Sequence, residues 1–282
     1  MSARAAGRIA CLLALAAATA GPALGAAPMA PHAADPPAAD GGGLAAHRAT
    51  YELALDSVQG RDTVAASGHM AYQVSDACTS WATQQQLHLR TVSRDGQAID
   101  LVSDYATLEG KDGRHLAFDM KQRANGAVTQ QLRGDAVMDA SGAGRIHYTL
   151  PKRATVALPP GTLFPMAHTA AIIRAARAGL KSIAPELFDG TGPDGAQDTY
   201  VTILDWHPSP SQSDQPVLAA LGSSRVHVAF FSHAPGTITP DYESAMRYFD
   251  NGVADQLLMD FSGFTMRGTL RSLTLPRQRT RC

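Results

Sequence analysis

DYESAMRYFDNGVADQLLMDFSGFTMRGTLRSLTL, residues 241–275, carries the clearest structural signal in the chain. Tyr242, Met246 and Tyr248 lie at even spacing in its first part, and residues 257–261 repeat the pattern with Leu, Met and Phe. Successive side chains of a β-strand leave opposite faces, so apolar residues at a period of two predict half-buried strands. The segment is therefore predicted to contain three strands.

Two turn signals separate these predicted strands. Asp250-Asn251-Gly252 contains an Asn-Gly pair, which supplies the positive φ values of a type I′ hairpin turn. Ser262-Gly263 offers a second tight reversal before the last strand. The segment is predicted to form an antiparallel meander close to the C-terminus, fastened to a distant part of the chain.

The same alternation recurs upstream in segments of roughly ten residues separated by turn residues. Further strands are predicted at residues 44–55, 68–74, 81–92, 99–108, 115–121, 128–138, 142–150, 199–206 and 224–232. Asn125-Gly126 gives another hairpin signal, and we interpret Gln84-Gln85-Gln86 as a solvent-exposed strand face. Short strands at this spacing predict an all-β sandwich or barrel.

One segment interrupts the strands. Residues 164–178, FPMAHTAAIIRAARA, have helical composition, with Pro165 suited to a first helical turn and Gly179 to the position just past the end. Its apolar spacing predicts one amphipathic helix of about four turns. The Gly/Asp/Pro-rich residues 187–198 and the Pro/Ser-rich residues 207–216 are predicted to be loops, the second of them exposed.

The N-terminus has the pattern of a secretory signal peptide. Arg4 and Arg8 precede an apolar run at residues 9–20, and small residues follow up to Gly25. The run is shorter than the roughly 20 residues needed to cross a bilayer. Residues 1–25 are therefore predicted to be a cleaved signal, and the mature protein to be exported, soluble and, in a bacterium with two membranes, periplasmic.

The remainder divides into a leader and one domain. Residues 26–43 are mostly Ala, Pro, Gly and Asp, and such a segment is predicted to be flexible because it cannot bury enough apolar surface. Residues 44–282 are predicted to form a single β-rich domain. The chain has 24 Lys and Arg against 25 Asp and Glu, without a basic run, which argues against nucleic acid as a partner.

Cysteine usage fits an oxidising compartment. Cys11 would leave with the signal peptide, so that Cys78 and Cys282 remain. A lone pair in such a compartment is most simply one disulfide. It would close a loop of about 200 residues, for which chain entropy gives about 5 kcal/mol of stabilisation. A redox pair is the alternative, although Cys-X-X-Cys spacing is absent; a metal site lacks a His at ligand spacing to either cysteine.

No segment has the pattern of a catalytic or cofactor site. The histidines are scattered singly, without His-X-His or His-Glu-X-X-His: His32, His47, His69, His88, His115, His147, His168, His207, His227 and His233. Residues 189–200 superficially resemble a calcium loop, but Asp194 occupies the position that requires glycine. Gly-X-Ser-X-Gly and phosphate-binding glycine motifs are missing. We therefore predict no catalytic residues, no metal and no cofactor.

Short motifs spread over the predicted domain follow a specific order. They are His47-Arg48-Ala49 with Tyr51, Leu53 and Leu55; Gly68-X-Met70-X-Tyr72; Cys78-X-X-Trp81; Phe164-Pro165-X-X-His168; Leu187-Phe188-Asp189-Gly190; Pro240-Asp241-Tyr242-Glu243; Asn251-Gly252-Val253; and Met259-Asp260-Phe261 with Gly268-X-Leu270. In this order and spacing the chain resembles the EipB family of periplasmic cell-envelope integrity proteins.

The resemblance implies an exported, mostly β protein with an open, spiral or barrel-like antiparallel sheet and one main helix inserted mid-chain. It also implies a disulfide between Cys78 and Cys282, a role in envelope integrity under stress, and a periplasmic TPR-type protein as partner. It implies no catalytic activity. The long leader and residues 207–216 are not part of the pattern.

These observations predict a non-enzymatic periplasmic scaffold or binding protein that maintains the envelope. An open sheet beside a helix can leave a groove for a lipid-like or peptide ligand. The many Tyr, Phe and Met at strand positions either line such a groove or simply fill the interior. The alternatives are an envelope hydrolase with an unrecognised site and a pure interaction module whose loop at 189–198 or 207–216 docks a partner.

Overall fold

The computed structural model describes residues 43–211, 213–233, 239–261 and 263–276. The predicted signal peptide, nearly all of the predicted leader and Cys282 lie outside these residues. Within them, no helix combines the length and apolar character that a bilayer span requires.

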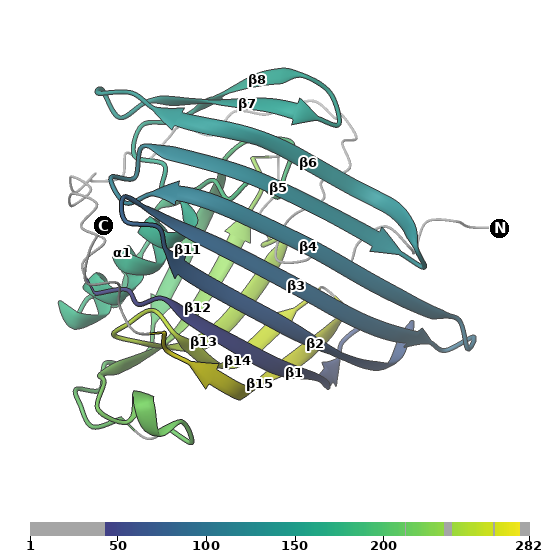
Figure 1. Cartoon of the computed structure of the whole chain (residues 1–282). Coiled ribbons are helices and arrows are strands. Elements are labelled where there is room, and N and C mark those ends of the chain that lie inside the picture. The colour runs from purple at the N-terminus through teal and green to yellow at the C-terminus, as the bar shows by residue number, and fades with distance from the viewer. Residues whose placement is uncertain (1–42, 212, 234–238, 262, 277–282) are drawn as a thin grey trace, which may run out of the picture.

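One antiparallel sheet dominates the described residues, and its strands are numbered along the chain in Figure 1. The elements are β1 His47–Val58, β2 Thr63–Asp76, β3 Ser80–Ser93, β4 Ala98–Gly110, β5 His115–Ala124, β6 Ala127–Met138, β7 Gly144–Leu150, β8 Ala154–Leu158, α1 Pro165–Arg177, β9 Ser182–Ile183, β10 Glu186–Leu187, β11 Gln197–Ile203, the 3₁₀ turn η1 Pro216–Leu218, β12 Ser223–Phe231, β13 Tyr242–Phe249, β14 Ala254–Asp260 and β15 Phe264–Thr274.

The order of the strands places both ends of the domain in the middle of the sheet. It runs β10-β11-β12-β13-β14-β15-β1-β2-β3-β4-β5-β6-β7-β8, with β9 beside β11. The C-terminal meander is thus fastened to the rest of the sheet by the pairing of β15 with β1. The end strands β8 and β10 do not pair with each other, so the sheet stays open while it curves around α1 (Figure 1). The predicted fold class is confirmed.

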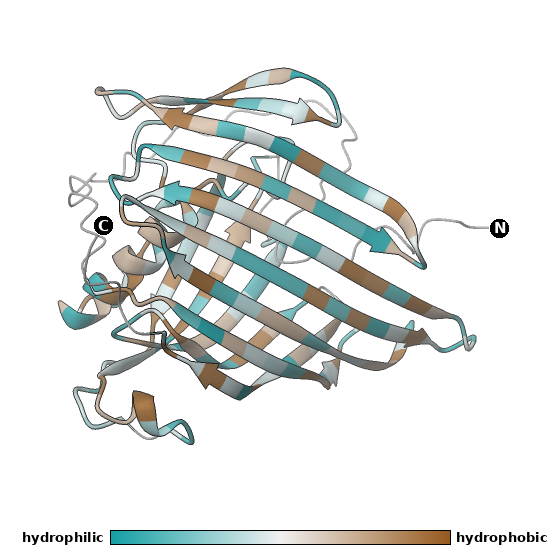
Figure 2. Cartoon of the chain, viewed as in Figure 1, coloured by the Kyte–Doolittle hydropathy of each residue, from teal (hydrophilic) through white to brown (hydrophobic). Residues whose placement is uncertain are grey.

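Hydrophilic and hydrophobic residues alternate along much of the long strands (Figure 2), and the alternating burial of their side chains distinguishes an inner from an outer face. In β3, Trp81, Thr83, Gln85, Leu87 and Leu89 are buried, and the residues between them are half-buried or exposed. The interpretation of Gln84-Gln85-Gln86 as one solvent-exposed face is therefore wrong for its middle residue. A period of two sends Gln85 to the same face as Leu87.

The two Asn-Gly turns differ. Asn125 and Gly126 have φ values of 49° and 80°, as a type I′ turn between β5 and β6 requires, so that prediction is confirmed. Between β13 and β14 only Gly252 has a positive φ, of 82°. There the Gly252 N–H donates to Phe249 O at 2.9 Å, which closes a type I turn followed by a left-handed glycine. The type I′ prediction at Asn251-Gly252 is wrong.

Helix α1 begins and ends where the sequence predicts. Pro165 is its first residue, and Gly179 follows its end with a φ of 75°. The N–H of Gly179 donates to Ala176 O and that of Leu180 to Ala175 O, both at 3.0 Å, which is the Schellman arrangement. At the start, Phe164 provides no side-chain cap. Glu109 on β4 takes that role, because its carboxyl oxygens accept the N–H groups of Met166 and Ala167.

The predicted disulfide stays a prediction, because Cys282 lies outside the described residues. Cys78 lies in the turn between β2 and β3 with a φ of 68°. We expect protein recovered from its native compartment and denatured without reductant to show no free thiol at either position. We expect Cys78→Ser to lower the free energy of unfolding by about 2–4 kcal/mol, because the unfolded chain regains loop entropy. Free thiols at both positions would contradict the prediction.

Candidate functional site

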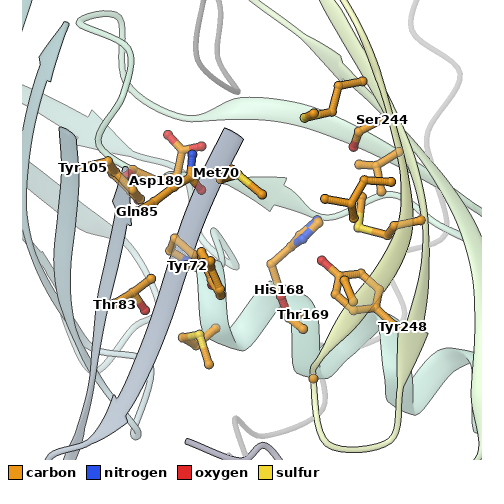
Figure 3. Close-up of a pocket in the computed structure, with 18 of the residues that line it drawn as sticks. Met70, Tyr72, Thr83, Gln85, Tyr105, His168, Thr169, Asp189, Ser244 and Tyr248 are labelled. Carbon is orange, nitrogen blue, oxygen red and sulfur yellow. The ribbon is translucent and has the colours of Figure 1, made fainter. Parts of the chain in front are cut away.

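The curved sheet surrounds a partly open cavity of about 220 Å³. Its walls come from the inner faces of β1 to β5, from the first turns of α1, from the segment after β10, and from β12 to β14. Figure 3 shows the labelled polar residues of β3 and β4 on one side and Ser244 and Tyr248 of β13 on the other, with α1 between them. The interior is thus not completely filled by the side chains that face it.

The wall formed by β3 and β4 is polar, which is unusual for the inside of a sheet. Gln85 lies opposite Tyr105 and Thr83 opposite Thr107 in the register of these strands, and Ser103 follows on the same face. All five line the cavity. Hydrogen-bonding groups therefore cover this side of the interior.

Two serine hydroxyl groups in the cavity wall have no hydrogen-bond partner among the described residues, whereas Thr83 of the same wall has Tyr72 as a partner. The two serine hydroxyls are Ser103 Oγ on β4 and Ser244 Oγ on β13. Ser103 is 1% exposed and Ser244 is 3% exposed. An unsatisfied buried hydroxyl costs about 1–3 kcal/mol, so such groups are rare in native interiors. Both line the same cavity, where a bound molecule can supply the missing partners.

Methionines make up much of the apolar part of the wall. Met70, Met120, Met166, Met246 and Met259 all line the cavity, from four different strands and the helix. Methionine is unbranched and polarisable, so its side chain adapts to ligands of different shape. A methionine-lined wall is therefore typical of a site that adjusts to its occupant.

The segment after β10 was predicted to be an ordinary loop and a candidate docking surface, but its first residues are buried. Asp189, Gly190 and Thr191 are all buried. Tyr105 Oη donates to Asp189 O at 2.6 Å, and Gln130 Nε2 donates to Thr191 O at 3.1 Å. These contacts fix the segment to β4 and β6 inside the sheet, so this part of it is unavailable for docking.

Gly190 shows why this segment cannot take other residues. Its φ is 79°, and a Cβ at this position would lie 2.4 Å from the Phe118 ring. Only glycine avoids both the backbone strain and the collision. Because Gly190 packs closely against Phe118, the neighbouring Asp189 lies at the cavity wall.

Asp189 is the one acid among the residues that line the cavity, in the part of the chain that the structure describes. Its Oδ1 accepts the Thr191 hydroxyl at 2.8 Å and the Thr191 N–H at 3.1 Å. Burial raises the pKa of this carboxyl from 3.8 to about 7, against the opposing effect of the two hydrogen bonds. The group therefore titrates near neutral pH.

This raised pKa gives a prediction for stability. The folded protein holds the Asp189 proton more tightly than the unfolded chain does. The contribution of Asp189 to the free energy of unfolding is therefore complete below pH 3.8 and is lost as the pH rises through about 7. Asparagine keeps the acceptor oxygen and never ionises. We expect Asp189→Asn to gain about 1–3 kcal/mol of unfolding free energy over the wild type between pH 5 and pH 8.

Denaturant titrations at several pH values measure this difference. Asp194→Asn, in an exposed position of the same loop, is the matched control and should show no such trend. A difference between Asp189→Asn and the wild type that does not vary with pH would contradict the burial of an ionisable group here.

His168 lies on α1 and its ring stands between Met70 and Ser244 in Figure 3. Burial lowers the pKa of His168 to about 4, so the ring is neutral at neutral pH. Thr199 Oγ1 donates to Pro185 O at 2.5 Å, which leaves its lone pair to accept His168 Nε2–H at 3.1 Å. The Thr199 proton is committed to a carbonyl, so this pair is not a nucleophile activated by a base.

Among the described residues, no lysine or arginine lines the cavity. Its titratable lining residues besides tyrosine are Asp189, His168 and His47, and burial lowers the pKa of both histidines. The cavity thus combines polar walls with an absence of fixed positive charge. This property was not predicted from the sequence, because it depends on which face of each strand points inward.

The scattered histidines gave no metal signal in the sequence, yet the fold gathers one group with suitable spacing. Ligand atoms of Glu186, Asp198 and His233 lie within 4.8 Å of one another. Asp198 and His233 are exposed, and Glu186 is half-buried. Sequence spacing missed the group because its members come from three segments. Exposed acidic groups of this kind are common without an ion, so we assign no metal to it.

Fold and cavity together define a barrel-like β protein built from one open antiparallel sheet around an unfilled interior. The chain belongs to the EipB-like family, whose sequence pattern matches residues 38–276. It is 26% identical over 239 residues to the cell envelope integrity protein EipB of Brucella abortus (strain 2308), covering 82% of this chain and 84% of that protein.

A solved structure agrees with this assignment. The crystal structure of a beta-barrel-like protein of a domain of unknown function from Brucella abortus superposes with a TM-score of 0.74 at 26% sequence identity. The match covers 83% of this chain and 98% of that chain. The family resemblance found in the sequence is therefore confirmed.

Proposed function

We propose that this protein is an exported, non-enzymatic binding protein that maintains the cell envelope by holding a lipid-like or peptide ligand inside its sheet. The envelope role rests on its similarity to a protein named for cell envelope integrity. The binding role rests on one observation: the interior is hollow, and two of its buried hydroxyls have no partner. A sheet whose Tyr, Phe and Met only filled its core would have neither feature.

The described residues favour binding over catalysis. Hydrolysis needs an activated nucleophile or water, and the Nε2–H of the cavity's His168 donates to Thr199, whose own proton lies on Pro185 O. Apart from Asp189 and His47, the remaining polar side chains of the wall are hydroxyls and one amide, which recognise a molecule by hydrogen bonds. Their arrangement supports orienting a ligand.

A cavity-filling variant tests the proposal in cells. Ser103→Leu places apolar volume in the cavity and removes an unpartnered hydroxyl. In a strain that lacks the native gene, we expect this variant to reach wild-type abundance without restoring resistance to detergents and cell-wall antibiotics. Val102→Leu, on the other face of the same strand, is the matched control and should restore resistance. Full restoration by Ser103→Leu would overturn the binding role.

A protein partner, such as the TPR-type protein implied by the family, is a second proposal. Leu204 and Val217 flank residues 205–216 and are 55% and 52% exposed. Exposed large apolar side chains are common in protein-protein contacts. We expect Val217→Asp to reduce co-purification of such a partner. Retention of the partner by the double variant Leu204→Asp with Val217→Asp would exclude this surface.

A further inference from the structure

The charge of the cavity wall restricts the chemistry of its ligand. We infer, building on the proposed binding role, that the cavity takes an uncharged amphiphile: one short apolar chain with a neutral head that hydrogen-bonds, such as a hydroxyl or an amide. Three observations carry this inference. They are the lack of cationic side chains in the wall, the two unpartnered hydroxyls, and the small volume of the cavity.

An anionic head has no counter-charge in this site. The part of the chain that the structure describes places no Lys or Arg in the cavity wall, and the ionised form of the lining acid Asp189 would repel a carboxylate or phosphate. An unpaired charge in a buried site loses its hydration without compensation. Fatty acids in their ionised form and phospholipid head groups are therefore poor occupants.

A cationic head is also disfavoured. It would have to pair with Asp189, whose Oδ1 already accepts two hydrogen bonds from Thr191. The desolvation of two buried charges commonly exceeds their attraction. A neutral head avoids this cost and can hydrogen-bond either with Ser103 and Gln85 on one wall or with Ser244 on the opposite wall, all of which are buried.

The volume of the cavity limits the size of the ligand's apolar chain. A cavity of about 150 Å³ lined by aliphatic side chains takes up benzene, and the cavity here measures about 220 Å³. It therefore accommodates a chain of roughly eight carbon atoms and not two long acyl chains. The methionine wall lets the chain adapt its path.

Octyl compounds that differ only in the head group test this inference. The full mature protein is labelled with ¹³C-methyl methionine, and its methyl NMR signals are followed at pH 8 during titration with 1-octanol, octanoate or octylammonium. We expect octanol to shift the signals of Met70, Met120, Met166, Met246 and Met259, which line the cavity. Met138 and Met266 are buried outside the lining and serve as internal controls.

We expect octanoate and octylammonium to bind at least tenfold more weakly than octanol. Equal or tighter binding of either ion at the lining methionines would overturn the inference while leaving the binding role intact. If none of the three compounds shifts these signals, both the inference and the cavity-binding role fail. The outcomes therefore separate the two proposals.

Two variants test the part played by the hydroxyls. We expect Ser103→Ala or Ser244→Ala to weaken octanol binding about three- to tenfold, the effect of one lost hydrogen bond. Neither should destabilise the free protein, because each removes an unsatisfied polar atom. Ser67→Ala, at an exposed position of β2, is the matched control and should change nothing. Octanol affinity unchanged in both cavity variants would overturn the assigned head-group contacts.

Discussion

Replacing Glu109 by alanine is expected to lower the free energy of unfolding by about 3–5 kcal/mol. Glu109 is on β4 and is 1% exposed. Its Oε2 accepts the Met166 N–H at 2.7 Å and its Oε1 accepts the Ala167 N–H at 2.8 Å. Both donors belong to the first turn of α1, which has no cap of its own. One carboxylate therefore joins the middle of the sheet to the start of the helix.

The magnitude follows from what alanine leaves behind. Two buried backbone N–H groups lose their acceptors, at about 1–3 kcal/mol each, and the missing side chain leaves a void that adds to the loss. Glutamine keeps one acceptor oxygen but turns an amide N–H₂ toward the second donor. We expect Glu109→Gln to cost about half as much as Glu109→Ala.

Glu109 should also make the free energy of unfolding depend on pH. Burial raises the pKa of Glu109 to about 7, so the folded protein binds this proton more tightly than the unfolded chain does. Stability from this group is complete below pH 4.5 and is lost as the pH rises through about 7. Since glutamine does not titrate, the loss caused by Glu109→Gln should be larger at pH 5 than at pH 8.

Chemical denaturation of the purified protein measures these effects. The control is Glu52→Ala on β1, which removes an exposed partner of Arg271 and should cost less than about 1 kcal/mol. Because Met166 and His168 line the cavity and follow directly from this cap, Glu109→Ala should also weaken ligand binding. A cost for Glu109→Ala equal to that of the control would refute the capping role.

Breaking the ion pair between Arg247 and Asp255 is expected to cost about 3–5 kcal/mol as well. The two residues face each other across β13 and β14. Arg247 Nε lies 2.8 Å from Asp255 Oδ1, and Nη2 lies 2.6 Å from Oδ2. Their side chains are only 13% and 10% exposed, and the guanidinium also lies over the Phe249 ring at 4.9 Å. Asp255→Ala would leave a buried cation without its partner.

A comparison of the single variant with an apolar replacement of both residues separates the pair from its surroundings. We expect Asp255→Ala to be strongly destabilising, whereas the double variant Arg247→Met with Asp255→Leu should recover most of the loss, since apolar side chains can replace a buried pair. The exposed pair of Arg90 and Asp100, 56% and 56% exposed, is the reference, and Asp100→Ala should cost less than about 1 kcal/mol. Equal costs for the two aspartate variants would contradict this account.

Much of the fold could be predicted because local signals agreed with it. Alternation located the long strands, and Pro165 and Gly179 marked both ends of α1. Strands β8, β9 and β10 were missed because they are short: β9 and β10 have two residues each and no period to detect. The Asn251-Gly252 turn type was wrong because Asn-Gly also suits a type I turn followed by a left-handed glycine.

The site was harder to predict than the fold. Alternation divides Gln84, Gln85 and Gln86 between two faces but does not say which face is the interior, and a polar run suggested solvent. In β4 the apolar Val102 and Leu108 point outward, while Ser103 and Glu109 are buried. The period alone therefore gave no warning of a polar interior, and no sequence pattern records an unfilled volume.

Burial of the 189–191 segment was equally hidden. Its Gly, Asp and Pro content is typical of exposed turns, but Tyr105 donates to Asp189 O and Tyr148 donates to the adjacent Gly192 O from distant strands. Tertiary contacts of this kind depend on how the sheet curves around the segment, so the local sequence does not predict them.

Native mass spectrometry of protein recovered gently from its native compartment tests the central claim most directly. We predict a wild-type population carrying one small non-covalent molecule, which is absent from Ser103→Leu and released intact on unfolding. Identical masses for the wild-type and Ser103→Leu proteins, once the substitution itself is subtracted, would contradict a ligand in the interior of the sheet.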